Sequence, residues 1–108
     1  VEAQLQNENA GDIWAFYGAQ VEGDAARFEA IDHEAIGNFK GVRKIKAAEK
    51  TPGEWNRYEI QVSGGNLELK INGILVNQAT GLEVLSGPIG LQSEGGEIHF
   101  RAVQITEL

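Results

Sequence analysis

Apolar and polar residues alternate along most of this chain, and turn residues separate the alternating runs. Near the start, Val1, Ala3 and Leu5 alternate with polar residues. Because successive side chains of a strand point to opposite faces, this pattern predicts strands with one apolar face. Further runs of this kind span residues 13–21, 42–47, 55–63, 67–71, 74–76, 89–94 and 98–105. About eight or nine short strands with regular turns are typical of an antiparallel β-sandwich.

Two local features refine this all-β prediction. Asn72-Gly73 is the strongest hairpin signal in the chain, since a type I′ turn needs positive φ at both central residues. Within 98–105 the apolar residues switch from one strand face, with Ile98 and Phe100, to the other, with Val103 and Ile105. A bulge near Arg101-Ala102 would bring both pairs to the same face.

Residues 24–36 fit two interpretations. Asp24 as N-cap and Gly37 as stop suit a short helix, whereas the alternation from Arg27 to Ile31 suits a strand. Local propensity is a weak guide beside tertiary context. In a chain so rich in strands we expect strand and loop here, with the helix as the alternative.

The apolar face of the expected strands predicts the hydrophobic core. Trp55, at the entry to the strand over 55–63, is expected to anchor that core, with stacking on a ligand ring as the alternative. The other expected core residues are Val1, Ala3, Leu5, Ile60, Val62, Leu69, Ile71, Ile89, Leu91, Ile98 and Phe100.

Composition narrows the classes of protein and of ligand. A chain of 108 residues forms one domain, and its net charge of −7 argues against nucleic acid or an anionic membrane as partner. No apolar run approaches the roughly 18 residues that a membrane span needs. Cysteine is absent, which excludes disulfides and thiol nucleophiles. These features fit a protein that acts on neutral ligands.

The order of several short motifs resembles the 3-keto-disaccharide hydrolase domain family, which has a concanavalin-like jelly-roll fold. No single motif is specific, but their order over about a hundred residues is, and it is densest from Glu49 to Leu108. The motifs are Glu2-x-Gln4, Asn9-Ala10-Gly11-Asp12, Pro-Gly-Glu-Trp-Asn at 52–56, Asn-Gly at 72–73, Gly-Pro-Ile-Gly-Leu-Gln-Ser-Glu-Gly at 87–95, and Phe-Arg at 100–101.

In such jelly rolls the ligand lies on the concave face of a sheet. Alternation places Glu2 and Gln4 on one face of their strand, and Gln92 and Glu94 on one face of theirs. Carboxylates accept hydrogen bonds from sugar hydroxyls, and amides both donate and accept them. These four residues therefore form a candidate sugar-binding floor, with a solvated outer face as the alternative.

Two further residues complete the candidate site. Trp14 could stack on a sugar ring. Arg101 would supply a cation that polarises a ketone, or else form an ion pair with Glu94 or Glu97.

The resemblance implies cleavage of glycosides already oxidised to a ketone at C3 of the sugar. The ketone acidifies the hydrogen on C2, so a carboxylate can remove it and the leaving group at C1 can depart. Glu94 or Glu2 would be the base and Arg101 the electrophilic partner. Two other functions stay open: a non-catalytic carbohydrate-binding module using the same face and Trp14, and a structural domain.

No cofactor is predicted. His33 and His99 lack the spacing of a zinc site, while the oxygen-rich loop over residues 7–12 leaves calcium as an alternative.

The resemblance implies a bacterial periplasmic or secreted protein, and it covers the family domain without its first strands. We therefore expect residues 1–108 to form one jelly-roll domain that is the C-terminal portion of a longer domain. An uncovered strand over Glu2 and Gln4 would recruit a second copy, or a chain carrying the missing strands.

Overall fold

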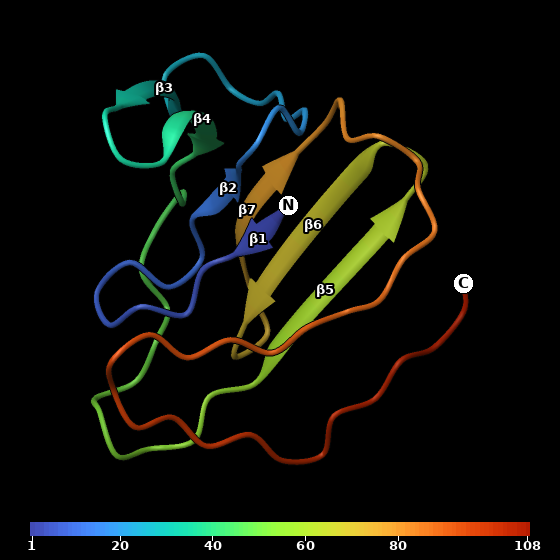
Figure 1. The fold of residues 1–108 in the computed structure, drawn as a ribbon. Coiled ribbons are helices and arrows are strands. Elements are labelled where there is room, and N and C mark those ends of the chain that lie inside the picture. Colours follow the sequence, from blue (N-terminus) through green and yellow to red (C-terminus); the bar gives the residue numbers. More distant parts are fainter.

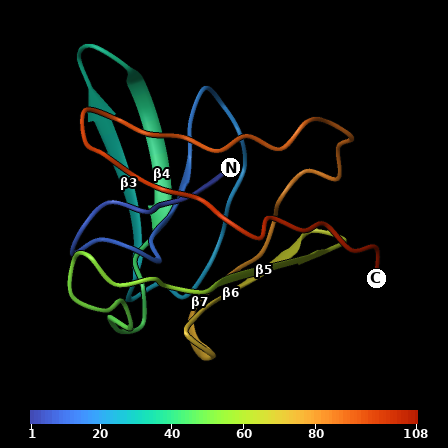
Figure 2. The same cartoon turned by 90° about the horizontal axis from the view of Figure 1, so that it is seen from below.

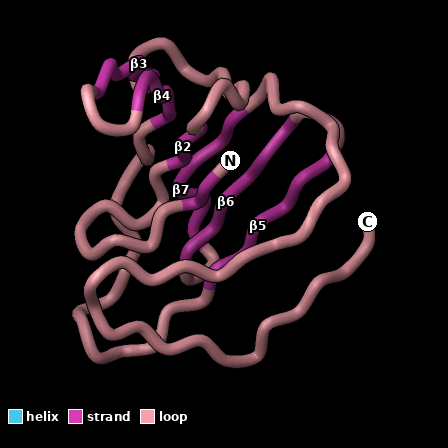
Figure 3. The backbone as a smooth tube through the Cα atoms, viewed as in Figure 1, coloured by secondary structure: helices cyan, strands magenta, loops and turns pink.

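The computed structural model describes residues 1–108 and contains strands and loops but no helix (Figures 1 and 3). None of its segments is therefore a helix long and apolar enough to cross a membrane. The seven strands are β1 (Glu2–Ala3), β2 (Ile13–Ala15), β3 (Phe28–His33), β4 (Gly37–Val42), β5 (Tyr58–Ser63), β6 (Asn66–Ile71) and β7 (Ile74–Ala79). The all-β prediction is confirmed.

The strands form two antiparallel sheets. The first has the order β1-β2-β4-β3, and the second is the meander β5-β6-β7. Figure 2 shows the two sheets at an angle to each other, with the β3–β4 hairpin projecting away from the second sheet. The arrangement is sandwich-like and compatible with a small, incomplete jelly roll.

The core lies where the inward face of the first sheet meets β6 and β7. Ile13 and Val42 from the first sheet pack with Leu69, Ile71 and Val76 from the second, and all five are fully buried. Each such side chain stabilises the fold by ~1.5–3 kcal/mol relative to an exposed one. The core predictions for Leu69 and Ile71 are confirmed, and Ala3 and Leu5 are half-buried.

The hairpin prediction at Asn72-Gly73 is confirmed. Asn72 has a φ of 52° and Gly73 a φ of 79°, as a type I′ turn requires. The Asn72 side chain also accepts a hydrogen bond from the backbone N–H of Arg57 at 2.9 Å, which holds the turn against the start of β5.

The strand interpretation of residues 24–36 is confirmed, and the helical alternative is wrong. Asp24 forms a turn in which its carboxylate accepts from the backbone N–H of Ala26, and β3 follows. β3 pairs over its whole length with β4, so the sheet supplies the hydrogen bonds that a helix would have made internally. The strand expected over 42–47 is displaced, because β4 ends at Val42.

The expected strands over 89–94 and 98–105 are absent, and so is the bulge near Arg101-Ala102. Everything after β7 is loop (Figure 3), and this segment passes outside β5 (Figure 1). Ile89 is 73% exposed and Leu91 55% exposed, and Ile98 and Phe100 also reach solvent. The predicted core residues of this segment are therefore wrong, because alternation yields a strand only where another strand supplies hydrogen bonds and a covering layer.

Four other core predictions are wrong. Val1 lies at the chain start, and Trp55 is 45% exposed in the loop before β5. Ile60 and Val62 pair with Leu69 and Leu67 and share their face, but β5 is an edge strand that, unlike β7, lies beyond the cover of the first sheet.

Candidate functional site: the outer face of the first sheet

The face of the first sheet that points away from the core carries rows of polar and aromatic side chains. In one row the strand register places Glu2 opposite Trp14, Trp14 opposite Gly41, and Gly41 opposite Glu29. Because alternate residues share a face, Gln4 and Arg43 belong to the next row of this outer face.

Gly41 creates the space that Trp14 occupies. A Cβ atom at position 41 would lie 2.3 Å from Cε3 of the Trp14 ring and 2.4 Å from the Ile13 carbonyl oxygen. The indole therefore lies across β4 at a point where no other residue would fit.

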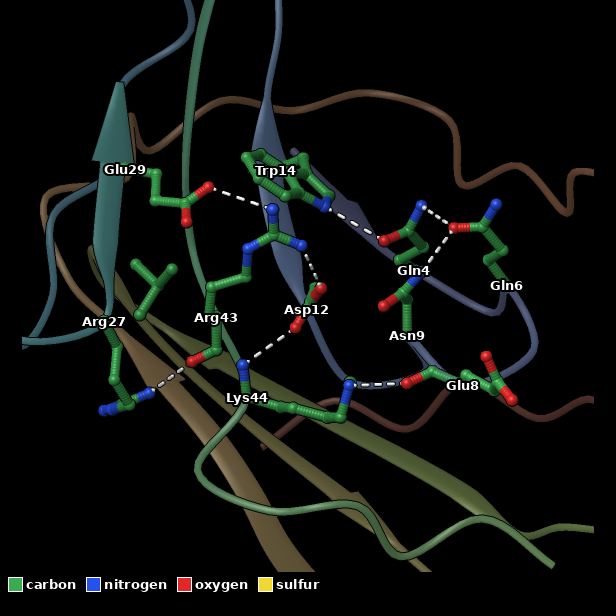
Figure 4. Close-up of polar contacts among 12 residues, drawn as sticks. Gln4, Gln6, Glu8, Asn9, Asp12, Trp14, Arg27, Glu29, Arg43 and Lys44 are labelled. Atoms are coloured by element: carbon green, nitrogen blue, oxygen red, sulfur yellow. Dashed lines mark hydrogen bonds and ion pairs between the residues drawn. The ribbon is translucent and has the colours of Figure 1, made fainter. Parts of the chain in front are cut away.

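Arg43 lies next to the indole and joins three parts of the sheet. Its guanidinium is 4.8 Å from the centre of the Trp14 ring. It donates to Oδ2 of Asp12 and to Oε2 of Glu29, each at 3.0 Å (Figure 4). The hydrogen bond to Glu29 raises the pKa of Arg43 above its already high value, Asp12 adds to the rise, and partial burial opposes it. Arg43 thus stays charged, and its position is fixed.

Three amide side chains gather at the other side of Trp14 (Figure 4). The indole Nε1 donates to Oε1 of Gln4 at 3.0 Å. Oε1 of Gln6 accepts from Asn9 at 2.8 Å and, over a longer 3.4 Å, from Gln4. The Tyr58 hydroxyl donates to the Gln4 carbonyl at 2.7 Å, which ties this cluster to the second sheet.

These residues border a groove of about 300 Å³. Amides, a guanidinium and aromatic rings around one hollow suit a sugar, which has hydroxyls at its rim and apolar C–H faces. The residues that line the groove are Gln4, Gln6, Asn9, Trp14, Phe16, Ile31, Ile36, Phe39 and Arg43.

Of the predicted site residues, Glu2, Gln4 and Trp14 lie together on this face. Burial raises the pKa of the Glu2 carboxyl above its ordinary value of 4.5, the Glu94 carboxylate adds to the rise, and the N-terminal amino group opposes it. Glu94 therefore lies close enough for its charge to act on Glu2. Gln92 donates to Glu94 at 2.8 Å, but both belong to the exposed loop after β7 rather than to a strand.

Arg101 lies elsewhere. Its guanidinium is 3.9 Å from the centre of the Trp55 ring, and it forms no ion pair with Glu94 or Glu97. Glu97 instead contacts His99 at 2.7 Å. The cation beside the candidate site is Arg43, which the sequence did not single out within the alternating run over 42–47. Only the strand register, which brings Arg43 next to Asp12, identifies it.

Trp14 is only 5% exposed, since Arg43, Gly41 and the Phe39 ring surround it. It forms the floor of the groove. Phe16 and Phe39 are more accessible than Trp14 and offer the ring surface that was expected from the indole.

A buried asparagine holds the site in place from the core side. Asn77 of β7, fully buried, donates to the carbonyls of Gly11 and Val42 at 2.9 and 2.7 Å. Its Oδ1 accepts from Arg27 at 2.7 Å, and the same Arg27 nitrogen donates to the Arg43 carbonyl at 2.8 Å. Through Asn77 and Arg27, the second sheet thereby fixes the backbone of Val42 and Arg43.

The loop over residues 7–12 helps to hold Arg43 and Lys44 in position. Asp12 is buried, and its two oxygens accept from Arg43 and from the backbone N–H of Lys44. Lys44 reaches back to the Glu8 carbonyl at 2.7 Å. No three His, Cys, Asp or Glu side chains in the structure are grouped as a metal site requires.

Comparison with curated proteins and with solved structures found no match. The model of one protein family, the 3-keto-alpha-glucoside-1,2-lyase-like domain, matches residues 1–106. That match covers nearly the whole chain and agrees with the all-β fold and with the carbohydrate-type groove. The chain belongs to the 3-keto-alpha-glucoside-1,2-lyase-like domain family.

Proposed function

We propose that this domain cleaves 3-keto-glycosides by elimination on the outer face of the first sheet. The observation that carries the proposal is the half-buried Glu2 carboxyl, which has a raised pKa and shares a row with Trp14 beside the amide groove. Family membership supports the substrate class.

Glu2 is the proposed base. The C3 ketone acidifies the C2 hydrogen, and the carboxylate takes this proton while the C2–H electrons form an enolate whose negative charge lies on the C3 oxygen. The enolate electrons then form the C1=C2 double bond and restore the C3 ketone. The C1–O bond breaks, and the leaving oxygen receives the proton. A base whose pKa is raised toward the working pH transfers protons more effectively than an exposed carboxylate. Glu94, whose charge reaches Glu2, is the competing candidate.

Arg43 is the proposed electrophile, in place of Arg101. A guanidinium has five N–H donors, and the hydrogen bonds to Asp12 and Glu29 use two of them. A fixed cation next to the groove can stabilise the oxygen on which the enolate charge develops. Arg101 is stacked on Trp55 and has no role in this proposal.

Turnover of a 3-keto-glucoside by purified variants tests the proposal. Glu2→Gln should abolish turnover and keep binding, because it preserves shape and removes the base. Arg43→Lys should lower kcat more than it raises KM, since the charge stays but the two-carboxylate geometry is lost. Arg101→Ala is the matched control and should leave kcat unchanged. Loss of turnover in Glu94→Gln but not in Glu2→Gln would move the base to Glu94.

A carbohydrate-binding module is the second candidate. It is favoured by one observation: neither Glu2 nor Glu94 lines the groove, whose polar lining consists of three amides and Arg43. Binding of an unoxidised glucoside, together with no turnover of any 3-keto-glucoside, would establish this function instead. The periplasmic or secreted location stays a prediction from the family resemblance.

A further inference from the structure

We infer that the groove binds a glycoside with an aromatic leaving group, with the sugar at its amide end and the aromatic ring at its other end. This inference rests on the proposed function and names its substrate class. It is carried by the division of the groove and by a continuous series of aromatic rings.

The groove has two chemically different ends. At one end, Gln4, Gln6 and Asn9 supply amide groups for sugar hydroxyls, as described above. At the other end the lining side chains are Phe16, Phe39, Ile31 and Ile36. A second sugar placed there would lose hydrogen bonds to water without gaining partners from these side chains, whereas an aromatic ring would lose none.

The apolar end is built by the sheet register. Ala15 of β2 lies opposite Lys40, so the next residue, Phe16, reaches Phe39 of β4, and Ile31 of β3 lies opposite Phe39 on the other side. The Phe16 and Phe39 rings are 5.1 Å apart at an interplanar angle of 34°. Phe39 in turn meets Trp14 edge-on at 5.4 Å. The rings thus extend from the amide end of the groove outward.

Tyr17 continues this series into solvent. Its ring is 6.4 Å from that of Phe16 and is 88% exposed. The residue has a φ of 55° and precedes Gly18, which has a φ of 82°. A bulky residue with positive φ is uncommon and strained, and such strain clusters at ligand sites. Here the turn presents an aromatic ring at the open end of the series, where it can cover a bound aromatic group.

Calorimetric titration with two unoxidised ligands, phenyl glucoside and methyl glucoside, tests the inference on the intact chain. We expect phenyl glucoside to bind at least about tenfold more tightly, the effect of one good aromatic contact. Phe16→Leu should remove most of this difference, because it should weaken binding of phenyl glucoside far more than binding of methyl glucoside. Tyr17→Ser, an exposed change that does not disturb the sheet, should reduce it less. Trp55→Leu removes an exposed ring outside the groove and should change neither affinity.

Equal binding of the two glucosides would overturn the inference, as would a Phe16→Leu variant that weakens both equally. If Phe16→Leu does not fold, Tyr17→Ser is the deciding variant. An affinity ratio in Tyr17→Ser equal to that of the unmodified chain would then overturn the inference. Failure of both ligands to bind would also overturn it. The proposed function is judged separately by turnover of 3-keto methyl glucoside, which has no aromatic group.

Discussion

β6 and residues 89–94 were both expected to be strands with one aliphatic face, yet only β6 is part of a sheet. β6 lies between β5 and β7, and β2 and β4 of the first sheet cover its Leu face. The later segment has no strand beside it and no layer above it, and its Ile89 and Leu91 face solvent. The same local pattern therefore gives a core strand in one place and an exposed loop in the other.

This difference shows what alternation means physically. A strand is stable when its backbone N–H and C=O groups find partners on both sides and its apolar face is covered. Within residues 1–79 the strands pair with one another, and the two sheets cover each other's apolar faces. After Ala79 the chain makes one isolated bridge, between Glu22 and Thr80, and then leaves the sheets.

Leucine-to-alanine substitutions should separate the two regions most strongly. Leu69→Ala should lower the free energy of unfolding by ~2–5 kcal/mol, because it leaves a cavity where the sheets meet. Leu91→Ala should change it by less than about 0.5 kcal/mol, since Leu91 is exposed. Urea melts of both variants measure this. A large loss at Leu91 would mean that the C-terminal segment packs in solution.

Asn77→Ala should have the second largest effect on the free energy of unfolding. It removes the hydrogen bonds that Asn77 makes with two backbone carbonyls and with Arg27 inside the core, so the free energy of unfolding should fall by about 1–3 kcal/mol. Gln78→Ala is the control, because its exposed side chain contacts Glu68 and should have little effect. Equal melting midpoints for the two variants would show that the Asn77 network does not hold the sheets together.

The Arg101–Trp55 contact joins the C-terminal segment to the folded part and should have a smaller effect. Arg101→Ala should cost about 0.5–1 kcal/mol, typical of an exposed cation–π pair. It should also lower the backbone NMR order parameters of residues 98–103 without changing amide hydrogen exchange in β6. Faster exchange in β6 would argue that the contact stabilises the whole domain.

The Glu2–Glu94 pair should give the smallest effect, on pH dependence. Because the folded-state pKa of Glu2 is raised, its contribution to stability is fully present below the ordinary value of 4.5 and is lost as pH rises through the raised value. Glu94→Gln should lower the pKa of Glu2 only in part, since burial is the larger cause. NMR titration of the Glu2 carboxyl measures this. An unchanged pKa would place Glu94 away from Glu2.

Pairing of the strand that carries Glu2 and Gln4 with a second copy or with another chain remains a prediction. β1 is an edge strand of the first sheet, and an open edge can pair with a second copy or another chain.

Local sequence determined those features that need only neighbouring residues. The Asn72-Gly73 turn follows from backbone sterics, and the shared face of Glu2 and Gln4 follows from the pleat of a strand. The strand from Phe28 was also predictable, since the strand-rich context outweighed the weak helical signal.

Only tertiary structure decided which apolar faces are covered and which cation meets the site. Val62 and Leu67 face each other across one strand pair, but only Leu67 is buried, because β6 lies under the first sheet and β5 does not. Likewise Arg43 lies beside Trp14 because the register sets it opposite Asp12, while Arg101 stacks on Trp55 in the loop before β5. Burial and long-range pairing depend on how the sheets stack, and that geometry is not contained in any short stretch of the chain.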